Sequence, residues 1–159
     1  MPANVKPIPD GYEGAIPYLI CRGAAAAIEF YKKAFGAEVS VRMEGPGGTV
    51  GHAELRVCGA LVMLADEVVA MGHKSPQSLG GSPVSLYIYV KDVDTLARRA
   101  IDAGAKVVRP LADQFYGDRS VQLEDPFGHA WGFAAHVEDV SPEEMKRRAE
   151  AVMGNASPK

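Results

Sequence analysis

Two polar side chains at alternate positions of one apolar segment are the feature of this 159-residue sequence that most suggests chemistry. His52 and Glu54 lie within GHAELRVCGALVML, residues 51–64. Successive side chains of a β-strand point to opposite faces, so His52, Glu54 and Arg56 are expected on one face. An imidazole beside a carboxylate predicts a general acid/base pair, which makes His52 and Glu54 candidate catalytic residues. The alternative is a polar cluster on an open sheet, which contributes little.

Aromatic and polar side chains at alternate positions of the other predicted strands fall on this same face. With Arg56, the candidate ligand-binding residues on it are Tyr18, Met63, Tyr87, Tyr89 and Gln122. A concave surface of this mixed character is typical of a small-molecule site, whereas a plain solvent-facing sheet is more polar. Tyr116 and Arg119 are expected at the rim of the site. Arg119 would either hold an anionic ligand group or form a salt bridge with Asp118 or Asp125.

The elements that position these side chains occur twice in the chain. The apolar strand and helix that follow Tyr18 recur after Tyr87, at an offset of 69 residues. The glycine that ends each helix is Gly36 in the first copy and Gly104 in the second, at an offset of 68. A constant offset of this length is too long for a solenoid repeat. We therefore predict an α+β fold of two tandem βαβββ units, which pair to bury a shared core.

The predicted organisation is a single domain that covers residues 1–159. The first unit spans residues 12–66, a loop follows at 67–83, and the second unit spans 84–137. Loops as long as this one often act as lids. Residues 138–159 form a C-terminal helix and tail, because a Ser-Pro-Glu-Glu capping box opens a helical run there.

Composition excludes several classes of function. With 17 Lys and Arg against 20 Asp and Glu the net charge is −3, and no basic patch predicts nucleic-acid binding. No apolar run approaches the length of a membrane span. The two cysteines form no Cys-x-x-Cys motif, and the N-terminus lacks the apolar region of a signal peptide. These features predict a cytoplasmic protein.

Several segments in order resemble one known group of proteins. They are YLICRGAAAAIEFYKKAFGAE in the first unit, then SPQSLGGSPVSLYIYVKDVD and DQFYGDRSVQLEDPFGHAWGFAAHVEDVSPEEM in the second. Over roughly residues 12–150 the chain is similar to the vicinal-oxygen-chelate superfamily of glyoxalases, bleomycin resistance proteins and dioxygenases, in its PhnB-like branch. The resemblance implies an eight-stranded, cupped mixed sheet, often completed in a homodimer, around a small-molecule ligand. Enzymes of the superfamily hold a divalent metal in the cup through His, Glu or Gln on the first and fourth strands of each unit.

Carried onto this sequence, the four metal-ligand positions fall near Ile16, Met63, Ser85 and Gly132. None of these is a normal ligand for a divalent ion, so no metal and no other cofactor is expected at the superfamily position. The favoured function is therefore metal-free binding of a small molecule. One alternative is a lyase, isomerase or dioxygenase that uses a non-standard metal site or His52 and Glu54. Another is a regulatory module whose cup only mediates dimerisation.

Overall fold

The first unit of the chain is a four-stranded sheet with one helix on its inner face. The computed structural model describes residues 5–154. The unit consists of β1 (Tyr18–Cys21), α1 (Ala24–Phe35), β2 (Glu38–Glu44), β3 (Val50–Val57) and β4 (Ala60–Asp66). Its strand order is β1-β4-β3-β2, with β1 parallel to β4 and the other pairs antiparallel.

The second unit repeats this arrangement strand for strand. It consists of β5 (Ser85–Tyr89), α3 (Val93–Ala103), β6 (Lys106–Asp113), β7 (Asp118–Glu124) and β8 (Ala130–His136). The order β5-β8-β7-β6 and the parallel β5–β8 pair match the first unit. The duplication and the α+β class expected from the sequence are therefore confirmed. Within one chain the eight strands form two separate four-stranded sheets.

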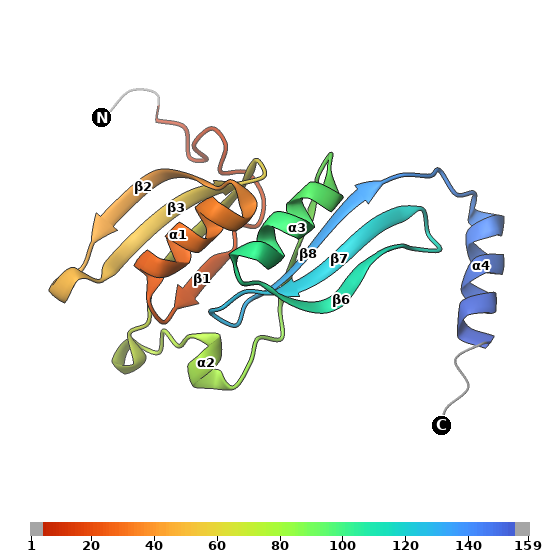
Figure 1. Cartoon of the computed structure of the whole chain (residues 1–159). Coiled ribbons are helices and arrows are strands. Elements are labelled where there is room, and N and C mark those ends of the chain that lie inside the picture. The colour runs from red at the N-terminus through yellow and green to blue at the C-terminus, as the bar shows by residue number, and fades with distance from the viewer. Residues whose placement is uncertain (1–4, 155–159) are drawn as a thin grey trace.

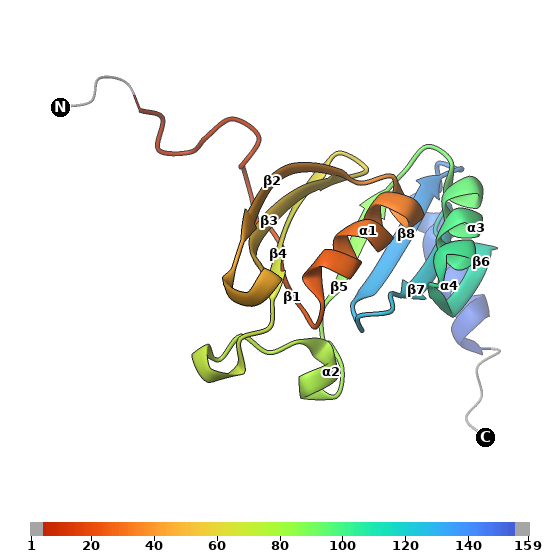
Figure 2. The ribbon, with the colours of Figure 1, turned by 60° about the vertical axis from the view of Figure 1, so that its left-hand side comes forward.

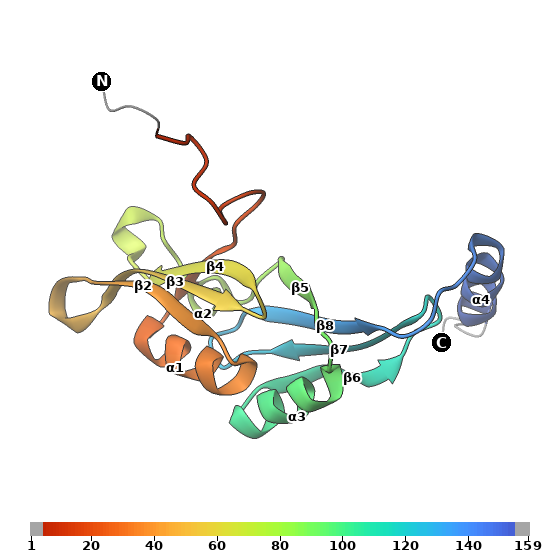
Figure 3. The ribbon, with the colours of Figure 1, turned by 90° about the horizontal axis from the view of Figure 1, so that it is seen from above.

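One core joins the two units. Helices α1 and α3 lie side by side on one face of the two sheets, and neither of them covers the other face of either sheet (Figures 1 and 3). Phe35 of α1 packs on Trp131 and Phe133 of β8, at ring-centroid distances of 4.9 and 4.8 Å. The helix of the first unit thus buries apolar surface on the sheet of the second, which favours association of the units.

The two helices are capped in different ways. Asp92 precedes α3 directly, and its side chain accepts a hydrogen bond from the backbone of Thr95. Helix α1 follows Gly23, which has no side chain to serve as a cap. The carboxylate of Asp66, at the end of β4, accepts the backbone N–H groups of Gly23 and Ala24 instead. The two helices therefore need different parts of the chain for their first turns.

The segment expected to be an unstructured lid has structure of its own. Residues 67–83 contain a short 3-10 turn (Val69–Met71) and α2 (Pro76–Leu79). Glu67 accepts the backbone N–H of Ser75 at 2.6 Å, and Pro76 is buried against Gly128 of the second unit. Figure 2 shows α2 below the sheets, near the lower end of β1. This part of the loop is tied to the body of the protein, which corrects the expectation of a free lid.

The last helix extends away from the rest of the molecule. Helix α4 (Pro142–Gly154) follows β8 and stands apart from both sheets (Figure 1). None of its residues is buried. Arg148 ties it to the preceding segment through Glu138 and the carbonyl of Phe115. In residues 5–154 no helix is both long and apolar enough to cross a membrane.

Candidate functional site

The open face of the first sheet brings the predicted acid/base pair together. His52 Nε2 lies 3.2 Å from Glu54 Oε1, and the hydroxyl of Tyr18 lies 2.8 Å from His52 Nδ1. The strand register places Met63 next to both Tyr18 and Glu54. Tyr12, which the sequence analysis did not single out, donates its hydroxyl to Glu54. No pattern in the sequence marks Tyr12, because it precedes the first strand.

The bond from Tyr12 lowers the pKa of Glu54. It is the main cause that holds the pKa of Glu54 below its ordinary value, and the contact with His52 acts in the same direction. Burial acts against these contacts but does not outweigh them. Glu54 is therefore a carboxylate at neutral pH, and a low pKa makes it a weak general base. The geometry suits a polar anchor for a ligand better than proton abstraction.

The open face of the second sheet carries a cluster of tyrosines. The rings of Tyr87 and Tyr89 meet edge to face, with centroids 5.7 Å apart. Burial and the nearby Tyr116 raise the pKa of Tyr87 to about 12, so its hydroxyl stays protonated. Gln122 faces the same way, because it pairs with Gly132, which in turn pairs with Tyr87. Four of the predicted ligand-binding residues therefore gather here.

A polar chain that the sequence analysis missed runs from this face to the end of β8. Asp118 is buried and accepts hydrogen bonds from Tyr89, at 2.5 Å, and from His136 Nδ1, at 2.9 Å. His136 Nε2 contacts Asp139 at 2.9 Å. Asp118 and His136 lie far apart in the sequence, and only the pairing of β7 with β8 brings them together.

Arg119 does not join the predicted site. Its guanidinium forms two hydrogen bonds with Asp94 of α3, at 2.8 and 2.9 Å, and a third with Asp113. These contacts place Arg119 on the helix-covered side of the second sheet, opposite Ser120 and Gln122. Arg119 therefore forms salt bridges, with Asp94 and Asp113 and not with Asp118 or Asp125, which were the partners expected. A ligand on the open face does not reach this guanidinium.

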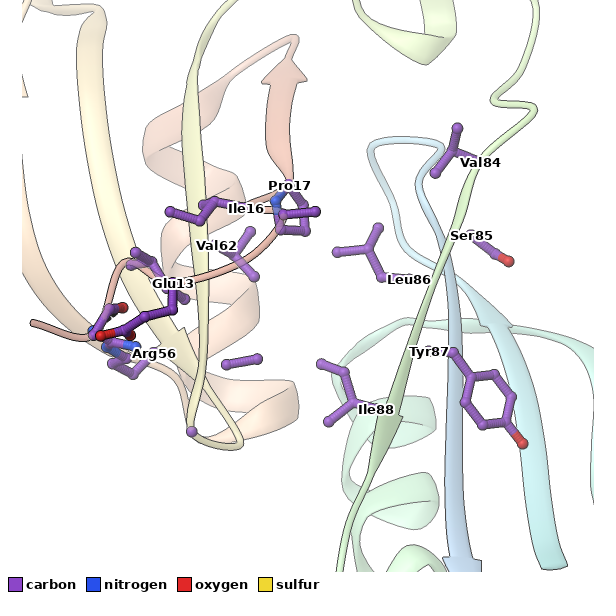
Figure 4. A pocket seen from close by; sticks show the side chains of 15 residues that line it. Glu13, Ile16, Pro17, Arg56, Val62, Val84, Ser85, Leu86, Tyr87 and Ile88 are labelled. Atoms are coloured by element: carbon purple, nitrogen blue, oxygen red, sulfur yellow. Dashed lines mark hydrogen bonds between the residues drawn. The ribbon is translucent and has the colours of Figure 1, made fainter. Parts of the chain in front are cut away.

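A cavity of about 680 Å³ lies at the seam between the units. Figure 4 shows β4 and the segment before β1 on one side and β5 on the other. Its apolar lining comes from both units and includes Ile16, Pro17, Leu61, Val62, Leu86 and Ile88. Of the residues predicted from the sequence, only Arg56 and Tyr87 border it. The predicted site is thus divided over two sheets, and this cavity lies between them.

The positions that carry the metal in the related enzymes do not fit a metal here. Tyr18 lies beside Met63 and Tyr87 beside Gly132, whereas Ile16 precedes β1 and lines the cavity. A phenol, a thioether and a glycine are poor ligands for a divalent ion. A Cβ at Gly132 would lie 2.4 Å from the ring of Tyr87, so that ring fills the space of any other side chain. Within residues 5–154 no three His, Cys, Asp or Glu side chains come together as a metal site.

Comparisons with known proteins agree with this fold. An uncharacterized protein of Mycobacterium tuberculosis is 45% identical over 149 residues, which cover 92% of this chain and 84% of the relative. The PhnB protein from Bacillus cereus has the same fold, with a TM-score of 0.60 and 21% identity over 77% of this chain and 99% of the neighbour. The fosfomycin resistance protein FosX from Listeria monocytogenes, solved with Mn(II) and sulfate, has a TM-score of 0.57 and 18% identity, over 86% and 95% of the two chains.

A family model matches most of the chain. It covers residues 16–133, from the segment before β1 to the middle of β8, and so includes both units. The expected resemblance, which was based on the sequence segments of both units, is therefore confirmed. The protein belongs to the Glyoxalase/Bleomycin resistance protein/Dioxygenase superfamily.

Proposed function

We propose that the protein binds a small organic molecule at the seam between its two units, without a metal ion at the superfamily position. The observation that supports this most directly is the cavity of about 680 Å³, which apolar side chains of both units line. Its volume lies in the range of about 300–1,000 Å³ that is usual for ligand sites. Arg56 supplies a polar group that can orient a ligand in such a site, whereas the side chain of Tyr87 points away from the cavity (Figure 4). Tyr18, Met63, Tyr89, Tyr116 and Gln122 extend the surface along the open faces.

We further propose that the protein acts as a homodimer in the cytoplasm. Tyr18, Tyr87 and Tyr89 are 48%, 46% and 59% exposed on the open faces, and none of the residues of α4 is buried. Exposed apolar surface of this kind usually marks an interface. A second copy would cover it and complete the cup. The two free cysteines, Cys21 and Cys58, suit a reducing compartment.

The binding proposal is tested by differential scanning fluorimetry of the untagged protein against a library of small organic molecules. We expect compounds that raise the melting temperature of the wild type but not of Val84→Trp, because residue 84 is exposed and borders the cavity. Val69→Trp, at an exposed position of the loop at residues 67–83 and outside the cavity, is the matched control. Hits that stabilise the Val84→Trp variant equally would place binding elsewhere.

An enzymatic function is the second candidate, as a lyase, isomerase or dioxygenase. The contact between His52 and Glu54 favours it, as does the Mn(II) found with FosX. Elemental mass spectrometry of protein purified without chelator separates the two proposals. We expect less than one tenth of an equivalent of any divalent transition metal. A stoichiometric metal, or turnover of a superfamily substrate that His52→Ala abolishes, would establish the enzyme instead.

A further inference from the structure

The guanidinium of Arg56 borders an apolar cavity without a carboxylate partner. Its Nη2 donates to the carbonyl of Gly11 at 3.0 Å, and no ion pair of Arg56 is formed within residues 5–154. Of the eight other arginines, five form ion pairs within the described residues, namely Arg22, Arg42, Arg119, Arg147 and Arg148. A half-buried guanidinium that forms no direct ion pair can still donate to an anion that reaches it.

The nearby acidic groups do not fill this role. Glu54 lies two residues away on β3, and the charge of Arg56 is the smallest of the causes that lower the pKa of Glu54. Its carboxylate, however, is hydrogen-bonded to Tyr12 and His52 and not to Arg56. Glu13 also borders the cavity, but its side chain is exposed and forms no ion pair with Arg56 in the described part of the chain. Solvent screens the charge of an exposed carboxylate. The guanidinium is thus the only cationic group on the lining of the cavity.

The segment before β1 holds the guanidinium in place. Gly11 accepts its hydrogen bond and has a φ of +83°, in the left-handed region that favours glycine. A Cβ at this position would lie 2.6 Å from Nη2 of Arg56. The glycine therefore allows both the turn and the close approach of the side chain. Any larger residue at position 11 would push the guanidinium away from this carbonyl.

We propose that the seam cavity takes an amphipathic anion, with its apolar body against Leu86 and Ile88 and its oxyanion on Arg56. The inference rests on the proposed binding function and adds the chemical class of the ligand. The lining of the cavity has two parts of different chemistry. Apolar side chains of both units form most of it, and the guanidinium of Arg56 supplies a positive charge. A carboxylate, sulfonate or phosphonate offers a guanidinium two acceptor oxygens.

The test is isothermal titration calorimetry of the full chain with octanoate, 1-octanol and octylamine, three probes of one chain length and different charge. We expect octanoate to bind about tenfold tighter than octanol, and octylamine to bind most weakly. Arg56→Met should reduce the affinity for octanoate to that for octanol. Gly11→Ala should reduce the preference in the same direction. Arg109→Met, an exposed arginine of β6 outside the cavity, controls for net charge and should keep the preference.

The outcomes distinguish this inference from the binding proposal beneath it. Equal affinity of wild type for octanoate and octanol would overturn the anion assignment and leave binding at the seam intact. A preference for octanoate that survives in Arg56→Met would also overturn it. Failure of all three probes to bind the wild type, together with no hit in the fluorimetry library, would remove the binding proposal itself.

Discussion

Gly132 leaves room for the ring of Tyr87 on the surface of the second sheet, because glycine has no side chain. The ring of Tyr87 lies against this glycine so closely that a Cβ would meet it at 2.4 Å. Gly132 is not among the residues with positive φ, so its backbone would accept any amino acid. The requirement for glycine therefore comes from the neighbouring ring alone. The aromatic surface of the site depends on this pair.

Gly132→Ala should destabilise the protein by about 1–3 kcal/mol, because the ring of Tyr87 must leave its place. In a Tyr87→Leu background the same change should be neutral or mildly stabilising, since alanine restricts the unfolded chain. Urea unfolding of the four proteins in this double-mutant cycle gives the coupling. An equal cost in both backgrounds would show that the ring is not the obstacle.

For single residues, the sequence predicts which face of a strand each side chain lies on, but it does not predict the partner of each polar side chain. Alternation placed His52, Glu54 and Arg56 together, because the period of a strand depends only on local geometry. The partner of Arg119 was predicted wrongly, because Asp94 belongs to a helix whose approach to β7 no local pattern indicates. Tyr12 was missed for a similar reason, since its contact with Glu54 spans 42 residues.

The connection between β8 and α4 is held by a charged contact that depends on pH. His136 lies between Asp139 and Asp118, and hydrogen bonds to these two carboxylates raise its pKa above 6.5. A raised pKa means that the folded protein favours the protonated imidazole. The stabilisation from this contact is fully present below the pKa of the unfolded state and is lost as the pH rises through the shifted pKa of His136. The segment that leads to α4 is therefore held more firmly in mild acid than in alkali.

NMR titration of His136 should give a pKa above 6.5, and Asp139→Asn should move it down. Amide exchange of residues 137–141 should accelerate, beyond its intrinsic pH dependence, as the pH rises through the titration. A pKa of His136 at or below the ordinary histidine value of about 6.5 would contradict the arrangement.

The helices and their ends were predictable as elements, but the loop between the units was not. Gly36 and Gly104 end the two helices as left-handed caps, which local sequence indicates. The loop at residues 67–83 offered only a length and several glycines. Its order comes from Glu67, Ser75 and the contact of Pro76 with Gly128, and these contacts exist only once the second unit is in place.

A buried polar cluster links the two units of the molecule. Tyr31 of α1 donates its hydroxyl to Asp125 of the β7–β8 turn at 2.6 Å, and Trp131 donates to the same carboxylate at 2.9 Å. Burial alone would raise the pKa of Asp125, but the hydrogen bonds from His129, Tyr31 and Trp131 lower it overall. The charged carboxylate is fully satisfied, so the cluster joins the units without an unpaired buried group.

Tyr31→Phe should lower the free energy of unfolding by about 1–3 kcal/mol, because a buried carboxylate loses a donor. Tyr18→Phe removes a hydroxyl bond on the exposed face and should cost less than about 1 kcal/mol.

The lowered pKa of Asp125 means that the stability of the wild type should fall as the pH drops below about 4 towards the shifted value. Urea unfolding at pH 7 and pH 3 measures both effects. An equal cost of the two substitutions at pH 7 would contradict the role of the cluster.

The proposed homodimer can be tested through helix α4. None of the residues of α4 is buried, and an isolated helix of this length is marginal in water, so packing of α4 on a second copy would stabilise it. We expect the full chain to have twice the mass of one protomer by light scattering, and removal of residues 141–159 to shift it towards the monomer at low concentration. A truncated chain that remains a dimer at nanomolar concentration would exclude α4 from the interface.

The remote cap of α1 affects the order in which the chain can fold. Helix α3 receives its cap from Asp92, three residues from the amide that it accepts, and can form as soon as that segment exists. Helix α1 gains its cap only from Asp66, which lies 42 residues beyond Ala24. On a chain that emerges from its N-terminus, the first helix is thus completed only when the whole first unit has been made. We therefore expect two units of one architecture to differ in how early their helices are stabilised, one by a local contact and one only after a long loop has closed.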